Sequence, residues 1–218
     1  MDLQYNGEVH IPVDKTTVEG ELIIPHNAGA VVIFSHGSGS SRFSVRNQIV
    51  AKFLQQKNFG TLLLDLLTKE EDRVYNNRFN IDLLTKRLAG ATEWLERFPS
   101  AKECRIGYFG ASTGAASALR AATMLPQIQA VVSRGGRPDL AMNDLKKVQS
   151  PTLLIVGSLD IDVLQLNKHA YLQLTCEKKL EVVDGATHLF EEPGKMDIVS
   201  GLAAKWFEKY LHSATQET

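Results

Sequence analysis

The sequence has little cysteine and no long apolar stretch. It holds two cysteines, Cys104 and Cys176, in 218 residues, which is too few for a disulfide framework. No apolar run approaches the roughly 18–20 residues that cross a bilayer. The first residues also lack the basic and apolar regions of a secretory signal. We therefore expect a cytoplasmic protein with no membrane partner.

An excess of charge of either sign is also missing. The 24 Lys and Arg residues nearly balance the 25 Asp and Glu residues, so the net charge is −1. A nucleic-acid-binding protein needs a basic face that replaces phosphate counterions, so we expect no nucleic-acid partner. The sequence contains no nucleotide-binding glycine motif and no paired Cys and His spacing typical of a metal site.

Short apolar runs alternate with helical segments along the chain. Two early segments, near 8–12 and 16–25, alternate as antiparallel edge strands do. Near-continuous apolar runs, which are typical of buried parallel strands, follow at 30–35, 61–66, 105–109, 130–133, 152–157 and 180–185. Helical patterns separate most of them, at about 45–57, 80–98, 112–125, 162–174 and 194–211. This pattern predicts one α/β domain over residues 1–218. We expect three layers around a mostly parallel sheet of about eight strands, with no cap domain.

Ser112 is the candidate nucleophile. It lies within Gly-Ala-Ser-Thr-Gly at 110–114, between a predicted strand and a predicted helix. This is the context of a nucleophile elbow, in which the serine hydroxyl stands above the sheet beside a helix N-terminus. The alternative is a tight turn in which Ser112 only caps the helix.

Two later loops supply the other members of a catalytic triad. Asp160 follows the predicted strand at 152–157, and His188 follows the one at 180–185. The chain order Ser, Asp, His is that of the α/β-hydrolase fold. His188 would take the proton of Ser112 and Asp160 would orient the imidazole. The alternatives are a helix-capping role for Asp160, with Asp162 as the rival acid, and a surface-loop role for His188.

An oxyanion hole is predicted beside the nucleophile. The loop Ser-His-Gly-Ser-Gly-Ser-Ser at 35–41 follows the strand at 30–35, where this fold places its second oxyanion donor. We expect the backbone N–H groups of Ser38 and Thr113 to be the two donors. The alternative is that this loop is only a flexible connector.

Three arginines lie in loops of the same kind. Arg42 follows the predicted oxyanion loop, and Arg134 and Arg137 follow the strand at 130–133. A guanidinium facing the cleft would bind a substrate carboxylate or phosphate through paired hydrogen bonds. The alternative is an internal ion pair, such as Arg137 with Asp139.

The motifs FSHGSGSSR, GYFGASTGAA, VVSRGGRPDL, PTLLIVGSLD and GATHLFEEPG resemble those of an α/β-hydrolase of the dienelactone hydrolase-like family. The resemblance covers nearly the whole chain and is strongest to small bacterial members, which also occur fused to phosphoribosyltransferase domains. It implies a Ser or Cys–Asp–His triad with no metal and no organic cofactor. Dienelactone hydrolase itself carries a cysteine at the elbow, whereas this chain has Ser112, so the family name does not imply dienelactone cleavage.

These observations predict a serine hydrolase that cleaves a small carboxylic ester, lactone or thioester through an acyl-enzyme on Ser112. A non-catalytic small-molecule binding module on the same fold and an acyltransferase are the alternatives. The expected partner is a small ester or lactone substrate. A homodimer and a functional link to a phosphoribosyltransferase are further partner hypotheses.

Overall fold

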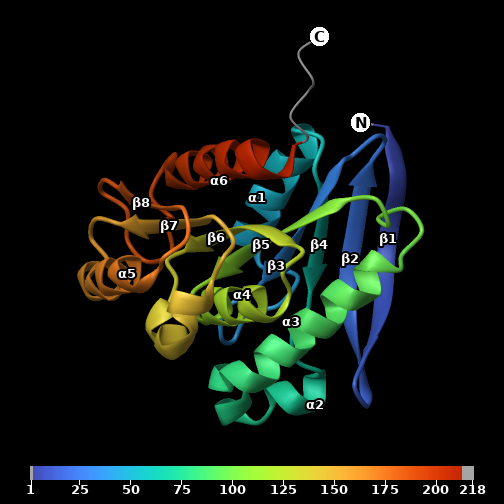
Figure 1. Ribbon diagram of the computed structural model, residues 1–218, viewed down its shortest axis with the longest axis horizontal. Helices are drawn as coiled ribbons and strands as arrows, with labels where there is room; N and C mark the ends of the chain where they lie inside the picture. The colour runs from blue at the N-terminus through green and yellow to red at the C-terminus, as the bar shows by residue number, and fades with distance from the viewer. Residues whose placement is uncertain (1, 213–218) are drawn as a thin grey trace.

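The computed structural model describes residues 2–212 and contains one eight-stranded sheet. The strand order is β1-β2-β4-β3-β5-β6-β7-β8 (Figure 1). Strands β1 (Leu3–Val13) and β2 (Thr16–Pro25) are antiparallel to each other, and β2 is antiparallel to β4 (Gly60–Leu64). All other neighbouring strands are parallel. The carboxyl ends of six strands therefore share one edge of the sheet, where ligand sites of open α/β sheets form.

The remaining strands are β3 (Ala30–Ser35), β5 (Arg105–Ala111), β6 (Ile128–Arg134), β7 (Thr152–Gly157) and β8 (Lys178–Val183). The helices are α1 (Val45–Gln56), α2 (Lys69–Asp72), α3 (Ile81–Glu96), α4 (Thr113–Met124), α5 (Ile161–Gln173) and α6 (Lys195–Leu211), with 3₁₀ segments η1 (Tyr75–Phe79) and η2 (Pro138–Lys147). Helices α1 and α6 cover one face of the sheet, and α3, α4, α5 and η2 cover the other (Figure 1).

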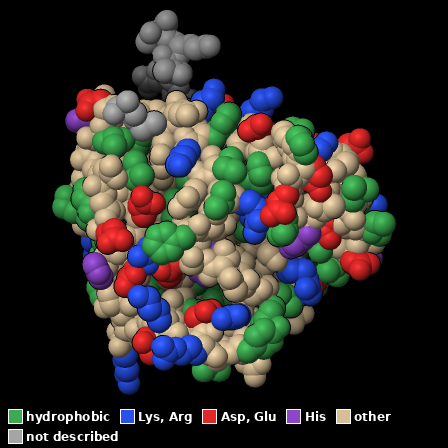
Figure 2. Space-filling view, turned by 180° about the vertical axis from the view of Figure 1, so that it is seen from behind, with side chains coloured by type: hydrophobic (Ala, Val, Ile, Leu, Met, Phe, Trp, Pro, Cys, Tyr) green, Lys and Arg blue, Asp and Glu red, His purple; other side chains and the backbone are tan. Residues whose placement is uncertain are grey.

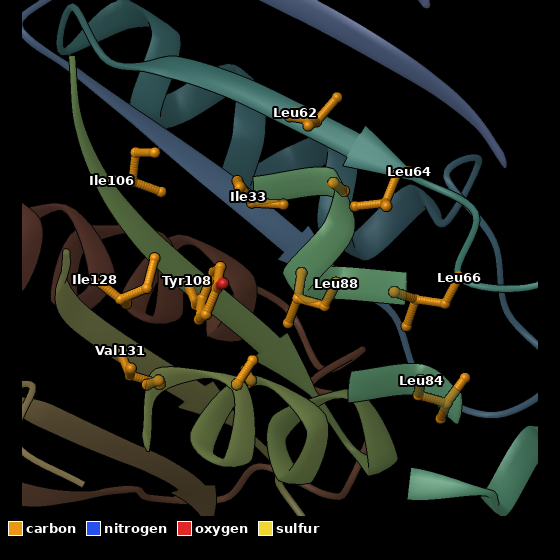
Figure 3. Close-up of a cluster of buried hydrophobic side chains, with 14 of the residues drawn as sticks. Ile33, Leu62, Leu64, Leu66, Leu84, Leu88, Ile106, Tyr108, Ile128 and Val131 are labelled. Atoms are coloured by element: carbon orange, nitrogen blue, oxygen red, sulfur yellow. The ribbon is translucent and has the colours of Figure 1, made fainter. Parts of the chain in front are cut away.

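Burial on both faces explains the continuous apolar runs of the central strands. In β3, Val31 and Ile33 pack with α3 and α4, whereas Val32 and Phe34 pack with α1 and α6. Figure 3 shows the first of these layers, with Leu84 and Leu88 of α3 lying over side chains of the sheet. Each such buried side chain contributes about 1.5–3 kcal/mol.

The predicted fold class is confirmed: three layers surround a mostly parallel sheet of eight strands. Three short elements, α2, η1 and η2, were not predicted. Helix α2 has only four residues and no buried side chain, so it leaves no apolar periodicity in the sequence. A capping box between Thr68 and Glu71 stabilises it instead.

The surface mixes charges of both signs. On the face shown in Figure 2, Lys and Arg side chains lie among Asp and Glu side chains, with no large area of one sign. This agrees with the net charge of −1. No helix within residues 2–212 is long and apolar enough to span a membrane.

Candidate active site

Strand β5 and helix α4 meet in a sharp turn at Ser112. The backbone of Ser112 has φ 51° and ψ −122°, a conformation that non-glycine residues rarely adopt and that marks functional turns. A Cβ on Gly110 would lie 2.5 Å from Ala115 Cα, and one on Gly114 would lie 2.1 Å from the Ser35 carbonyl oxygen. Both glycines are thus required by close backbone approach, as a nucleophile elbow demands.

Backbone hydrogen bonds hold this turn. The Ser112 N–H donates to the Arg134 carbonyl at 3.2 Å, and the Ser112 carbonyl accepts from the N–H groups of Ala115 at 3.1 Å and Arg137 at 3.0 Å. Ser112 occupies the N-cap position of α4, but its side chain makes no capping bond. The capping alternative therefore does not explain this serine, and its half-buried hydroxyl has no hydrogen-bond partner within residues 2–212.

Asp160 and His188 form a close pair. His188 Nδ1 lies 2.6 Å from Asp160 Oδ2, and the aspartate side chain is 13% exposed against 36% for the imidazole. Asp160 stands at the N-cap position of α5 without a side-chain capping bond. Asp162 is exposed in the first turn of α5 and contacts no partner in the described part of the chain. The structure thus pairs Asp160, and not Asp162, with the histidine.

The imidazole lies at the end of β6, beside the elbow. A Cβ on Gly135 would be 3.4 Å from His188 Cε1 and 3.2 Å from the His188 carbonyl oxygen. The preceding residue, Arg134, accepts the Ser112 N–H. With Nδ1 on Asp160, Nε2 is the ring nitrogen left for a substrate or nucleophile. Among the described residues, no hydrogen bond joins it to Ser112.

The predicted oxyanion loop runs directly against the nucleophile. A Cβ on Gly37 would be 3.1 Å from Ser112 Cβ. The Ser38 N–H donates to Thr113 Oγ1 at 2.8 Å, so this expected donor already has an acceptor. The Thr113 N–H has no acceptor among the described residues. A ligand oxygen could take the Ser38 N–H only by displacing the threonine hydroxyl.

His36 links the ends of β3 and β4. Its Nε2 accepts the Leu66 N–H at 3.0 Å and its Nδ1 lies 2.9 Å from the Gly37 carbonyl. Because Nε2 is an acceptor, the ring hydrogen is on Nδ1 and donates to Gly37. Burial lowers the pKa of His36, which keeps the ring neutral. This histidine supports the oxyanion loop and is not placed to act as a base.

Two of the three candidate arginines are paired inside the protein. Arg42 is buried and binds the carboxylates of Glu19, at 2.7 Å, and Asp65. Arg137 makes two bonds to Asp139, at 2.9 and 2.8 Å. Neither guanidinium is left unpaired for a ligand, and internal pairing was the stated alternative. Arg134 differs from both, because no carboxylate of the described chain binds it.

A pocket of about 410 Å³ opens beside the oxyanion loop, on the side of β4. Its lining includes His36, Phe43, Leu67 and Lys69. Sequence reasoning missed this pocket because the α2 segment that borders it was not predicted. Another pocket, of about 480 Å³, lies at the opposite edge of the sheet around the end of α4 and contains none of the candidate residues. No group of three possible metal ligands occurs within residues 2–212.

Comparison with known proteins assigns the chain to a family. The dienelactone hydrolase family model matches residues 18–216, and the chain belongs to that family. Its structure superposes on a dienelactone hydrolase from Anabaena variabilis with a TM-score of 0.93 and 48% identity, covering 97% of this chain and 100% of the other. The family supports a hydrolase activity for this chain.

More distant and longer relatives add to this. An esterase from Pyrococcus furiosus shares the fold, with a TM-score of 0.78 and 18% identity over 95% of this chain and 92% of that one. Two Mycobacterium tuberculosis proteins, provisionally named phosphoribosyl transferases, are each 50% identical over 205 residues. These residues are 94% of this chain and 46% of each relative, so the chain spans about half of their length.

Proposed function

We propose that this protein is a serine hydrolase that cleaves a small carboxylic ester, lactone or thioester through an acyl-enzyme on Ser112. The observation that carries the proposal is the Asp160–His188 pair, set at the same sheet edge as a serine in a strained strand–helix turn. Membership in the dienelactone hydrolase family supports the general class of reaction.

The proposed reaction begins with proton transfer from Ser112 to His188 Nε2. The serine oxygen attacks the carbonyl carbon, and the resulting imidazolium is stabilised by Asp160 across the 2.6 Å contact. His188 then protonates the leaving group, which departs and leaves the acyl group on Ser112. Water, deprotonated by His188, releases the acid and restores the serine.

The negative oxygen of the tetrahedral intermediate needs hydrogen-bond donors. The Thr113 N–H is one candidate, at the positive N-terminus of α4. The Ser38 N–H is the other, once the substrate oxygen replaces Thr113 Oγ1 as its acceptor. The elements added to the alternating strands and helices of residues 2–212 are the short α2, η1 and η2. This suits an open site and a small or extended substrate.

A non-catalytic binding module is the second candidate. Two observations favour it: the Ser38 N–H is already bonded to Thr113, and Ser112 is not hydrogen-bonded to His188. An acyltransferase would use the same residues with a different acceptor. The extra length and the name of the mycobacterial relatives support a functional link to a phosphoribosyl transferase. A homodimer remains a separate hypothesis on which this mechanism does not depend.

The test is covalent labelling with a fluorophosphonate, peptide mass mapping and turnover of a panel of esters. We expect the label on Ser112 and a loss of about 10⁴–10⁶ in kcat for Ser112→Ala. Ser100→Ala is the matched control, because Ser100 lies after α3 and away from this edge. An unlabelled Ser112, or more than a tenth of wild-type turnover in Ser112→Ala, would overturn the proposal.

A further inference from the structure

Arg134 is a buried cation without an anion. Three arginines are less than a tenth exposed: Arg42 at 9%, Arg87 at 5% and Arg134 at 4%. Arg42 binds two carboxylates, and Arg87 binds Glu71. Arg134 has one hydrogen bond, from Nη2 to the neutral Asn47 Oδ1 at 3.3 Å.

The remaining donors of Arg134 are poorly satisfied. Its Nε is buried with no hydrogen-bond partner among the described residues. Burial, and then the charge of Arg46, lowers the pKa of Arg134 to about 10, so the group is still a cation at neutral pH. Burying an unpaired charge is costly, and native proteins normally compensate it with a counter-charge or a bound ion.

The neighbours of Arg134 add positive potential. Asn47, its only hydrogen-bond partner, lies in the first turn of α1, which has no acidic residue. The N-terminus of a helix favours anions. Arg46 lies in the same turn, and its Nε is also buried without a partner in the described chain. Arg46 Nη1 bonds Glu191 at 2.6 Å, but the Glu191 side chain is 62% exposed.

The loop that carries His188 closes over this cluster. The Arg134 guanidinium carbon lies 6.0 Å from the centroid of the Phe190 ring. Gly135, the next residue, packs against His188. An ion bound to Arg134 would therefore lie next to the loop that positions the proposed base.

We propose that Arg134, Arg46 and the first turn of α1 form a binding site for an oxyanion, a phosphate or a carboxylate. Guanidinium groups bind such oxygens through paired, charge-assisted hydrogen bonds. The ligand takes the exposed place that Glu191 holds on Arg46 and completes the bonds of Arg134. The ligand is either a free anion that holds the His188 loop or a second anionic group of the substrate. The latter reading rests on the proposed function.

Binding is tested without catalysis, by thermal unfolding in phosphate against chloride at equal ionic strength. The wild-type Tm should rise saturably with phosphate, by roughly 5–10 °C at about a hundredfold above the dissociation constant. Arg134→Gln should abolish this rise. Arg137→Gln, which removes an equal charge from the same loop but from a guanidinium paired with Asp139, should keep it.

If Arg134→Gln does not fold, Arg46→Gln takes its place and should weaken phosphate binding about tenfold or more. An equal wild-type Tm in phosphate and chloride would overturn the site. So would an undiminished rise in the folded Arg134→Gln or Arg46→Gln variant.

A second measurement distinguishes the two sources of the anion. Paired esters, one with a remote carboxylate and one with a neutral methyl ester there, are compared in wild type and Arg134→Gln. A preference of about tenfold or more for the anionic ester, lost in the variant and inhibited competitively by phosphate, identifies a substrate group. Equal rates together with the phosphate-dependent Tm identify a free anion. If wild type cleaves neither ester, the proposed function fails, while the Tm series still decides the site.

Discussion

Replacing Gly114 by alanine should destabilise the protein, whereas the same change at Gly201 should stabilise it. Gly114 lies in the first turn of α4, where a Cβ would be 2.1 Å from the Ser35 carbonyl oxygen and 2.5 Å from that of His36. These are backbone atoms at the start of the oxyanion loop, so they cannot rotate aside as a side chain would. A Cβ on Gly201, within α6, meets nothing within 4 Å.

The two contributions differ in sign. Alanine is favoured over glycine within a helix by about 1 kcal/mol, and Gly201→Ala should keep this gain. Overpacking costs about 1–3 kcal/mol, at the upper end or beyond when backbone must move. Gly114→Ala should therefore lose a net free energy of unfolding of about 2 kcal/mol or more. For a chain of this size, each kcal/mol shifts Tm by roughly 2–4 °C.

Urea unfolding followed by circular dichroism, with a parallel thermal scan, measures both variants against wild type. The dependence on urea should stay unchanged, so that a shifted midpoint reports stability alone. A Gly114→Ala variant as stable as wild type would refute the close approach of α4 to the Ser35 and His36 backbone. The nucleophile turn described above would then need a different geometry.

Three further predictions concern side chains. Asp160→Asn should lower kcat of the proposed hydrolase by about 10⁴ and Asp162→Asn by less than tenfold; the reverse order in folded variants would assign the acid to Asp162. The lowered pKa of buried His36 means that the unfolded chain binds more protons as pH falls below 6.5. Wild type should therefore lose stability from pH 7.5 to about 5.5, and His36→Gln should lose less; equal losses in urea unfolding would contradict this. Burial raises the pKa of both Cys104 and Cys176, so iodoacetamide at neutral pH should alkylate them slowly and leave ester turnover intact, which thiol titration and a rate assay would check.

Local sequence patterns predicted the sheet and the elbow well. A central strand buried on both faces must be apolar along its whole length, so the run at 30–35 predicted β3 with its observed bounds. The spacing of Gly110 and Gly114 around Ser112 predicted a turn that only small residues permit, and the structure shows the clashes a Cβ would meet there. Helix α2 escaped prediction because a capping box stabilises it and no buried face does.

The choice between neighbouring acids depended on three-dimensional placement. Asp160 and Asp162 are two residues apart and chemically identical. The start of α5 directs Asp160 toward His188 and leaves Asp162 exposed. The sequence reasoning preferred Asp160 for its nearness to the strand end, but the expected capping by Asp162 is wrong, because Asp160 occupies the N-cap position.

The chain order of strands and loops by itself determined that Ser112, Asp160 and His188 would lie along one edge, because parallel strands share their carboxyl ends. The environment of each arginine was decided only by the tertiary structure. Arg42 and Arg134 both follow buried strands and look alike in sequence. Arg42 meets carboxylates from β2 and the end of β4, whereas Arg134 meets only the amide of Asn47 and an aromatic ring. A charge is stabilised by groups within a few ångströms, and the fold brings those groups from distant parts of the chain.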